Sequence, residues 1–321
     1  MSKNAKRYLS EPFMTDLKEG GLLNPLLERV KKDHTVCLEI REDYINIYYR
    51  GGNLIKIERK DNYVPWFDKH YCINKNVRVI NKLPKKLCAK TDVNAWVSAI
   101  PNLKEVMDFW FGINPKEERE FQQLFLRENN GFTIGNSTDY FIIDIEYDNH
   151  CGARFDLVAI EWESEGSVRK LQKQYSPKLT FIEMKYGDNA LTGKSGILNH
   201  IEDFKEYLNK HGLDPIRDEM VLLFKQKRAL GLIPALADNK NNIKKFSDKT
   251  DFVFLLANHD PASSKLKSVF DELSKSDLVN DLGINLKFCT SNFMGYGLYK
   301  QNIYPFAEFV DKFHRQIQCN S

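Results

Sequence analysis

The sequence predicts an α/β protein in which a mixed β-sheet core is flanked by helices and preceded by a β-rich N-terminal region. Three observations support this fold class. Hydrophobic residues make up 42% and charged residues 28% of the 321 residues, as is typical of a globular chain. Strand-like runs dominate the first third, and strand-like and helical runs alternate after residue 140. We therefore expect a β-rich region over 1–110 and a second domain over 111–321.

The first third contains a clear hairpin pattern. Strand-like runs at 35–40 and 44–50 precede Gly51 and Gly52, and the chain returns over 53–58. Two glycines supply the positive φ angles that a two-residue hairpin turn needs. This region therefore contributes at least one antiparallel strand pair.

Two helical segments are expected between the hairpin and the second domain. Asp92 can cap a helix that runs through Ala99. Pro101 is expected to interrupt it before a second segment over 103–111, because proline lacks the N–H that a helix interior requires.

The second domain is expected to begin with a helix. Asn114 and Pro115 are typical of a helix start, and the helix is expected to end near Gly131. The strands expected beyond it are 140–147, 154–163, 178–186, 251–257 and 284–290. The helices expected there are 194–210, 217–230, 263–274 and 305–317.

The charge is distributed unevenly. Residues 1–110 hold 20 of the 47 Lys and Arg and 14 of the 44 Asp and Glu, so they carry a net +6, and the remainder carries −3. One stretch has no acidic residue and seven basic ones: Lys69, Lys75, Arg78, Lys82, Lys85, Lys86 and Lys90. Such a stretch can track a phosphate backbone, and it can equally be a solvated lysine-rich loop.

Composition also bears on location. Mean hydropathy is −0.48 and no apolar run reaches the length of a membrane helix, so we expect no membrane partner. The first residues are polar and predict no signal peptide. The six cysteines form no CxxC pair, which favours a reducing, cytoplasmic setting over a disulfide scaffold or zinc site.

Charged residues interrupt two strands that otherwise read as buried. Asp156 lies in an apolar run, and Glu183 and Lys185 end another. Residues two apart in a strand share a face, so Glu183 and Lys185 project together. Two carboxylates can hold Mg²⁺, and a lysine can orient a water for phosphodiester hydrolysis. The same residues also suit a structural ion pair at a sheet end.

At this point the sequence resembles the PD-(D/E)XK nuclease superfamily, over roughly 115–210. Phe155-Asp156 stands where the family often has Pro-Asp, and Glu183-Met184-Lys185 matches the (D/E)XK motif. The resemblance implies a restriction-endonuclease-like fold with Mg²⁺ or Mn²⁺ as cofactor. It implies that Asp156, Glu183 and the Met184 carbonyl bind the metal, and that Lys185 positions or activates the attacking water.

Two further residues are candidates for this site. Glu118 borders the apolar face of the helix that starts the domain, and the family often adds a carboxylate from that helix; an acidic first turn also simply suits the helix dipole. His200 and Phe204 lie one turn apart where related exonucleases carry Gln and an aromatic residue. His200 could contact a phosphate or a metal-bound water, or be a packing residue.

Other basic residues are candidate contacts to nucleic acid. The segment 187–195 resembles a phosphate-binding loop but has five residues between its glycine and Gly-Lys-Ser, where that loop has four. Lys194 and Ser195 can still contact a phosphate at the helix start, or only cap the helix. Arg169, Lys170 and Lys173 fall between the two motif strands, in a segment that either straddles a groove or is a solvated hairpin.

The sequence therefore predicts a Mg²⁺-dependent nuclease acting on double-stranded DNA, with endonuclease action favoured. A role in bacterial defence or restriction is expected from the resemblance alone. Two alternatives stay open. One is a catalytically silent nuclease fold that binds nucleic acid or protein, and the other is an RNA-cleaving, toxin-type nuclease. The sequence also leaves a homo-oligomer open.

Overall fold

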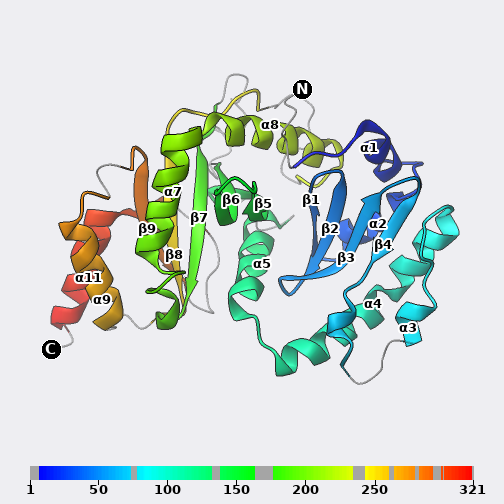
Figure 1. Ribbon diagram of the computed structural model, residues 1–321, viewed down its shortest axis with the longest axis horizontal. Helices are drawn as coiled ribbons and strands as arrows, with labels where there is room; N and C mark the ends of the chain where they lie inside the picture. The colour runs from blue at the N-terminus through cyan, green and yellow to red at the C-terminus, as the bar shows by residue number, and fades with distance from the viewer. Residues whose placement is uncertain are drawn as a thin grey trace. The chain divides into compact units, whose positions relative to one another are not determined.

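The computed structural model has a mixed α/β fold with two β-sheets, which confirms the predicted fold class at this level (Figure 1). The chain divides into two compact units. Unit 1 comprises Met1–Arg127 and Leu222–Asn239, and unit 2 comprises Glu128–Val221 and Lys240–Ser321. The structure describes residues 7–73, 78–131, 138–162, 176–233, 243–259, 264–278, 282–291, 298 and 300–319. In these ranges, no helix combines the length and the apolarity needed to cross a membrane.

Unit 1 contains an antiparallel sheet with the strand order β1-β2-β3-β4. Its strands are β1 (Val36–Ile40), β2 (Tyr44–Tyr49), β3 (Gly52–Arg59) and β4 (Tyr63–Trp66). The predicted hairpin is present, but Tyr49 pairs with Gly52, so its turn is Arg50-Gly51. Gly51 has φ +72°, and a Cβ on it would overlap the carbonyl of Arg119, so both conformation and space require glycine.

The helices of unit 1 pack around this sheet. They are α1 (Glu11–Leu17), α2 (Asn24–Lys32), α3 (Arg78–Asn81), α4 (Lys90–Ile113) and most of α5 (Glu117–Asn130), with a 3₁₀ turn at Lys69–Tyr71. The expected boundary at residue 110 lies inside α4. α5 begins in unit 1 and ends in unit 2, whereas α8 (Asp214–Ala229) begins in unit 2 and ends in unit 1.

The predicted break at Pro101 is wrong, because α4 continues through it. Proline in a helix interior costs about 3 kcal/mol. Ile100, Leu103 and Met107 are fully buried on one face of α4, and burying each such side chain contributes about 1.5–3 kcal/mol. Packing therefore outweighs the local penalty. Asn114 closes this helix instead of opening the next one, since its backbone N–H donates to the Trp110 carbonyl at 2.9 Å.

Unit 2 contains a mixed sheet with the order β10-β9-β8-β7-β6-β5. Its strands are β5 (Tyr140–Asp148), β6 (Arg154–Glu161), β7 (Leu179–Tyr186), β8 (Thr250–Ala257), β9 (Asn285–Ser291) and β10 (Tyr304–Pro305). β5, β6 and β7 pair antiparallel, whereas β7, β8 and β9 run parallel. The buried runs of Ile, Val, Leu and Phe that predicted these strands are the core of the unit.

Helix α7 (Ile197–His211) covers one face of this sheet, along β7 and β8 (Figure 1). Phe204 of α7 contacts rings of three strands, with centroid distances of 4.8 Å to Phe155, 5.5 Å to Phe181 and 4.9 Å to Phe252. The helices α9 (Ser264–Lys275) and α11 (Phe306–Cys319) pack on β9 through Phe288. α7 starts at Ile197, three residues later than expected, because Gly196 is extended and occupies its N-cap.

Candidate active site

Asp156 lies where strands β6 and β7 separate. The register between these strands ends at the pair Leu157 and Ile182, so Asp156 is the first residue of β6 beyond the ladder. Its Oδ2 accepts a hydrogen bond from the backbone N–H of Met184 at 2.7 Å. A side-chain carboxylate thus replaces the backbone partner that Met184 would otherwise need. This bond brings Asp156 to the middle of the Glu183-Met184-Lys185 segment.

Glu183 and Lys185 form a buried ion pair on one face of β7. Lys185 Nζ is 2.9 Å from Glu183 Oε1, and the two residues are 3% and 5% exposed. Leaving either charge buried alone would cost several kcal/mol, so each holds the other in place. The predicted projection of both side chains to one face is confirmed by this contact.

His200 approaches the same carboxylate oxygen. It lies in the first turns of α7, with Nδ1 3.1 Å from Glu183 Oε1. Burial and the positive charge of Lys185 together lower the pKa of His200 to about 4, although a backbone hydrogen bond with Ser195 acts in the opposite direction. The imidazole is therefore neutral at pH 7, and its contact with Glu183 is a close polar approach between a neutral ring and a carboxylate.

The donor set of this cluster fits a hard divalent cation. Asp156 and Glu183 provide carboxylate oxygens. The N–H and C=O of one strand residue point to the same edge, so the Met184 carbonyl faces the edge where Asp156 lies. Mg²⁺ commonly takes one or two carboxylates and completes its shell with water and substrate phosphate. Among the residues that the structure describes, no three or more His, Cys, Asp or Glu side chains form a group that could hold a metal ion.

The other predicted site residue is in a different unit. Glu118 lies in the first turn of α5, half-buried, in the part of the helix that belongs to unit 1. Asp156, Glu183, Lys185 and His200 all belong to unit 2. The role of Glu118 as an additional metal ligand therefore stays a prediction.

The predicted nucleic-acid contacts are scattered. Lys194 and Ser195 are exposed in the loop before α7, after a 3₁₀ turn at Asp188–Ala190. Lys82, Lys85 and Lys86 are exposed in unit 1, between α3 and α4. Arg78 starts α3, but its side chain is not described. The remaining four lie outside the described residues: Lys75, Arg169, Lys170 and Lys173.

Unit 2 contains a second buried charge cluster that was not predicted from the sequence. Asp251 on β8 is fully buried and accepts hydrogen bonds from Lys178 at 2.9 Å and Lys287 at 2.7 Å. Burial alone would raise the pKa of Asp251, but hydrogen bonds from Lys287, Lys178 and Asn285 hold it below its ordinary value. The available signal in the sequence was the position of this aspartate, within the strand Thr250–Ala257 and directly before its apolar residues. The cluster ties the starts of β7, β8 and β9 together.

Comparisons of the chain with protein-family models, curated proteins and solved structures give no match.

Proposed function

We propose that this protein is a metal-dependent nuclease that hydrolyses phosphodiester bonds, with DNA as the favoured substrate. The observation that carries the proposal is the hydrogen bond from the Met184 N–H to Asp156, because it joins an aspartate to a segment whose two neighbouring side chains are a buried carboxylate and a lysine. The succession of α5, three antiparallel strands and α7 supports a restriction-endonuclease-like core of the PD-(D/E)XK type.

Each residue has a distinct task in this proposal. Asp156, Glu183 and the Met184 carbonyl would hold Mg²⁺ or Mn²⁺, with Glu118 as a further candidate ligand. When bound, the ion polarises the phosphate and lowers the pKa of a coordinated water. Lys185, kept in place by Glu183, orients the attacking water and stabilises the negative charge that develops on the phosphate. His200, with Nδ1 3.1 Å from Glu183 Oε1, limits the positions that this carboxylate can take.

A second function is favoured by one feature of the same cluster. Glu183 Oε1 already contacts both Lys185 and His200, an arrangement that also suits a purely structural pair. The protein would then be a catalytically silent module that binds nucleic acid or protein. An RNA-cleaving nuclease keeps the chemistry and changes only the substrate.

A cleavage assay separates these functions. Plasmid DNA, linear DNA, single strands and RNA are each incubated with the protein in Mg²⁺, Mn²⁺ or EDTA. We expect nicking of plasmid DNA that needs the metal and is lost in Asp156→Ala and Lys185→Ala. Lys267→Ala, which removes an exposed lysine of α9 in the same unit, is the matched control and should cleave normally.

Each other outcome has a defined meaning. Cleavage of RNA alone supports the toxin-type alternative. Binding of nucleic acid without cleavage of any substrate supports the silent module. Metal-dependent cleavage that persists unchanged in both site variants contradicts the assigned residues.

A further inference from the structure

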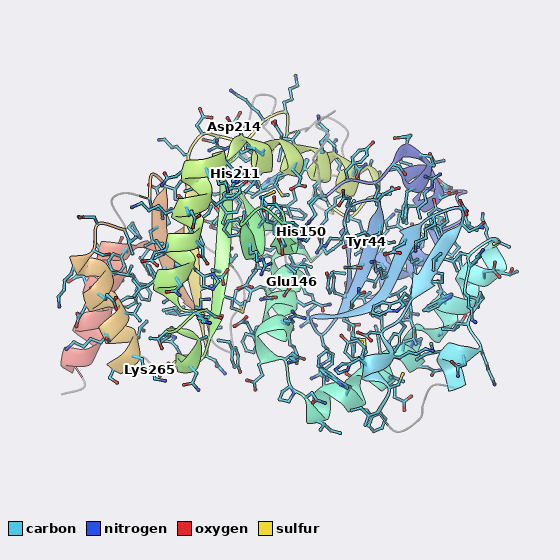
Figure 2. The ribbon with its side chains drawn as sticks, in the orientation of Figure 1. Tyr44, Glu146, His150, His211, Asp214 and Lys265 are labelled. Carbon is cyan, nitrogen blue, oxygen red and sulfur yellow. The ribbon has the colours of Figure 1, made fainter. Side chains whose placement is uncertain are left out.

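Unit 2 contains a pocket of about 580 Å³ between the β5–β6 turn and the second half of α7. The turn contributes one wall, with His150 at its tip, and α7 contributes the other, ending at His211; both histidines are labelled in Figure 2. The lining is mostly polar.

The pocket is adjacent to the candidate active site along two elements. Arg154, at its edge, is two residues before Asp156 on β6, which corresponds to about 6.6 Å along a strand. Asp203 and Tyr207 follow His200 on the same face of α7, about 4.5 and 10.5 Å further along the helix. A nucleic-acid strand with its scissile phosphate at Asp156 would therefore place a neighbouring nucleotide at this pocket.

The walls offer three kinds of contact. His150 is 69% exposed in its side chain, and the exposed ring of His211 lies 5.1 Å from that of the buried Tyr207, so two imidazole rings are available for stacking. Asp203 and Glu206 are exposed acceptors that form no hydrogen bond or ion pair with any described part of the chain. Arg154, which also pairs with Asp148 at 2.9 Å, and Lys210 are cations that can approach the flanking phosphates.

We propose that this pocket receives an unpaired nucleobase of the substrate strand, next to the phosphate to be cleaved, and that it selects bases with an exocyclic amino group. The proposal rests on the proposed nuclease function for its choice of ligand. Carboxylates accept hydrogen bonds from the amino groups of cytosine, adenine and guanine, whereas thymine and uracil have no such group. Stacking on the imidazole rings is tolerant of base identity, so the carboxylates determine the preference.

A binding experiment in EDTA tests the selectivity without cleavage. Fluorescently labelled oligo(dC) and oligo(dT) of equal length are titrated with the wild-type protein. We expect oligo(dC) to bind about tenfold more tightly, the contribution of one good carboxylate–amino contact. The variant Asp203→Ala/Glu206→Ala should bring the ratio of the two dissociation constants close to one. Glu202→Ala, an exposed acidic residue of α7 outside the pocket, should retain the preference.

A thiol footprint tests the location. Cys151 lines the pocket and is exposed, and Cys88 is an exposed thiol in unit 1. In the wild-type protein, bound oligo(dC) should slow the alkylation of Cys151 more than bound oligo(dT) does. This difference should be absent in the Asp203→Ala/Glu206→Ala variant. The rate of alkylation of Cys88 should be about the same with either oligonucleotide. No oligonucleotide binding, equal binding of the two, or a preference that survives the double substitution would each overturn the pocket proposal.

The two proposals fail separately. DNA cleavage without base preference in EDTA contradicts the pocket alone. Base preference in EDTA without cleavage of any substrate in metal contradicts the nuclease proposal alone.

Discussion

Replacing Lys185 with methionine tests whether Glu183 is held as a buried carboxylate. Methionine keeps most of the apolar stem of lysine and removes the ammonium group with its charge and its hydrogen-bond donors. The Glu183 side chain, 6% exposed, would then lose the cation with which it pairs. Breaking a buried pair on one side costs about 3–5 kcal/mol, so we expect a loss of at least about 3 kcal/mol.

Two comparisons make this prediction specific. Glu183→Gln/Lys185→Met removes both charges, so it should lose clearly less stability than Lys185→Met alone. Mg²⁺ supplies the positive charge that Lys185→Met lacks, so excess Mg²⁺ should stabilise this variant more than it stabilises the wild-type protein.

Urea unfolding and thermal melts in EDTA and in excess Mg²⁺ measure these differences. For a unit of this size, a loss of about 3 kcal/mol lowers the melting temperature by about 6–12 °C. If Lys185→Met unfolds within about 0.5 kcal/mol of the wild-type protein in EDTA, or if Mg²⁺ stabilises both equally, the buried carboxylate is not held as described.

Three further predictions concern the surroundings of the site and the rest of the fold. Gly51→Ala should destabilise unit 1 by at least about 2 kcal/mol in urea unfolding, because the new Cβ overlaps the backbone of Arg119 at a φ of +72°; an unchanged midpoint would contradict this close approach. The pKa of His200 is about 4 in the folded state, below its unfolded value, so protonation favours unfolding, and His200 should contribute about 2–3 kcal/mol to the loss of wild-type stability from pH 6.5 to 4. His200→Asn should be less sensitive over this range, and equal pH profiles would refute the assignment. Asp251→Asn should lower the free energy of unfolding in urea by about 3 kcal/mol, because Lys178 and Lys287 lose the carboxylate that they share. A loss below about 1 kcal/mol would show that this cluster does not hold the strands together.

Most of the sheet of unit 2 could be predicted from local sequence. Runs of β-branched and aromatic residues identify buried strands, and the observed bounds of β5 to β9 lie within two residues of the expected ones. The hairpin turn was placed one residue late, because two adjacent glycines do not show which of them adopts the positive φ. The predicted helix break at Pro101 is wrong because the local penalty of proline is outweighed by burial of the helix, which only the folded protein shows.

The contacts of the candidate site could also be predicted from the sequence only in part. Strand periodicity alone places Glu183 and Lys185 on one face, and the structure confirms that they touch. The contact of Asp156 with Met184 spans 28 residues and depends on the sheet register, so the sequence could suggest it only through the family resemblance. Asp251 escaped notice because one aspartate within an apolar run looks like a strand end until its lysine partners from neighbouring strands are known.

The most direct measurement is plasmid cleavage in Mg²⁺ by the wild-type protein, Asp156→Ala, Lys185→Ala and the control Lys267→Ala. If Asp156, Glu183 and Lys185 form a phosphodiester-hydrolysing site, the wild-type protein and the control convert supercoiled plasmid at the same rate, EDTA stops both, and the two site variants are slower by at least about a hundredfold. Equal rates for all four proteins in Mg²⁺, or no cleavage by the wild-type protein of any DNA or RNA substrate, would contradict it.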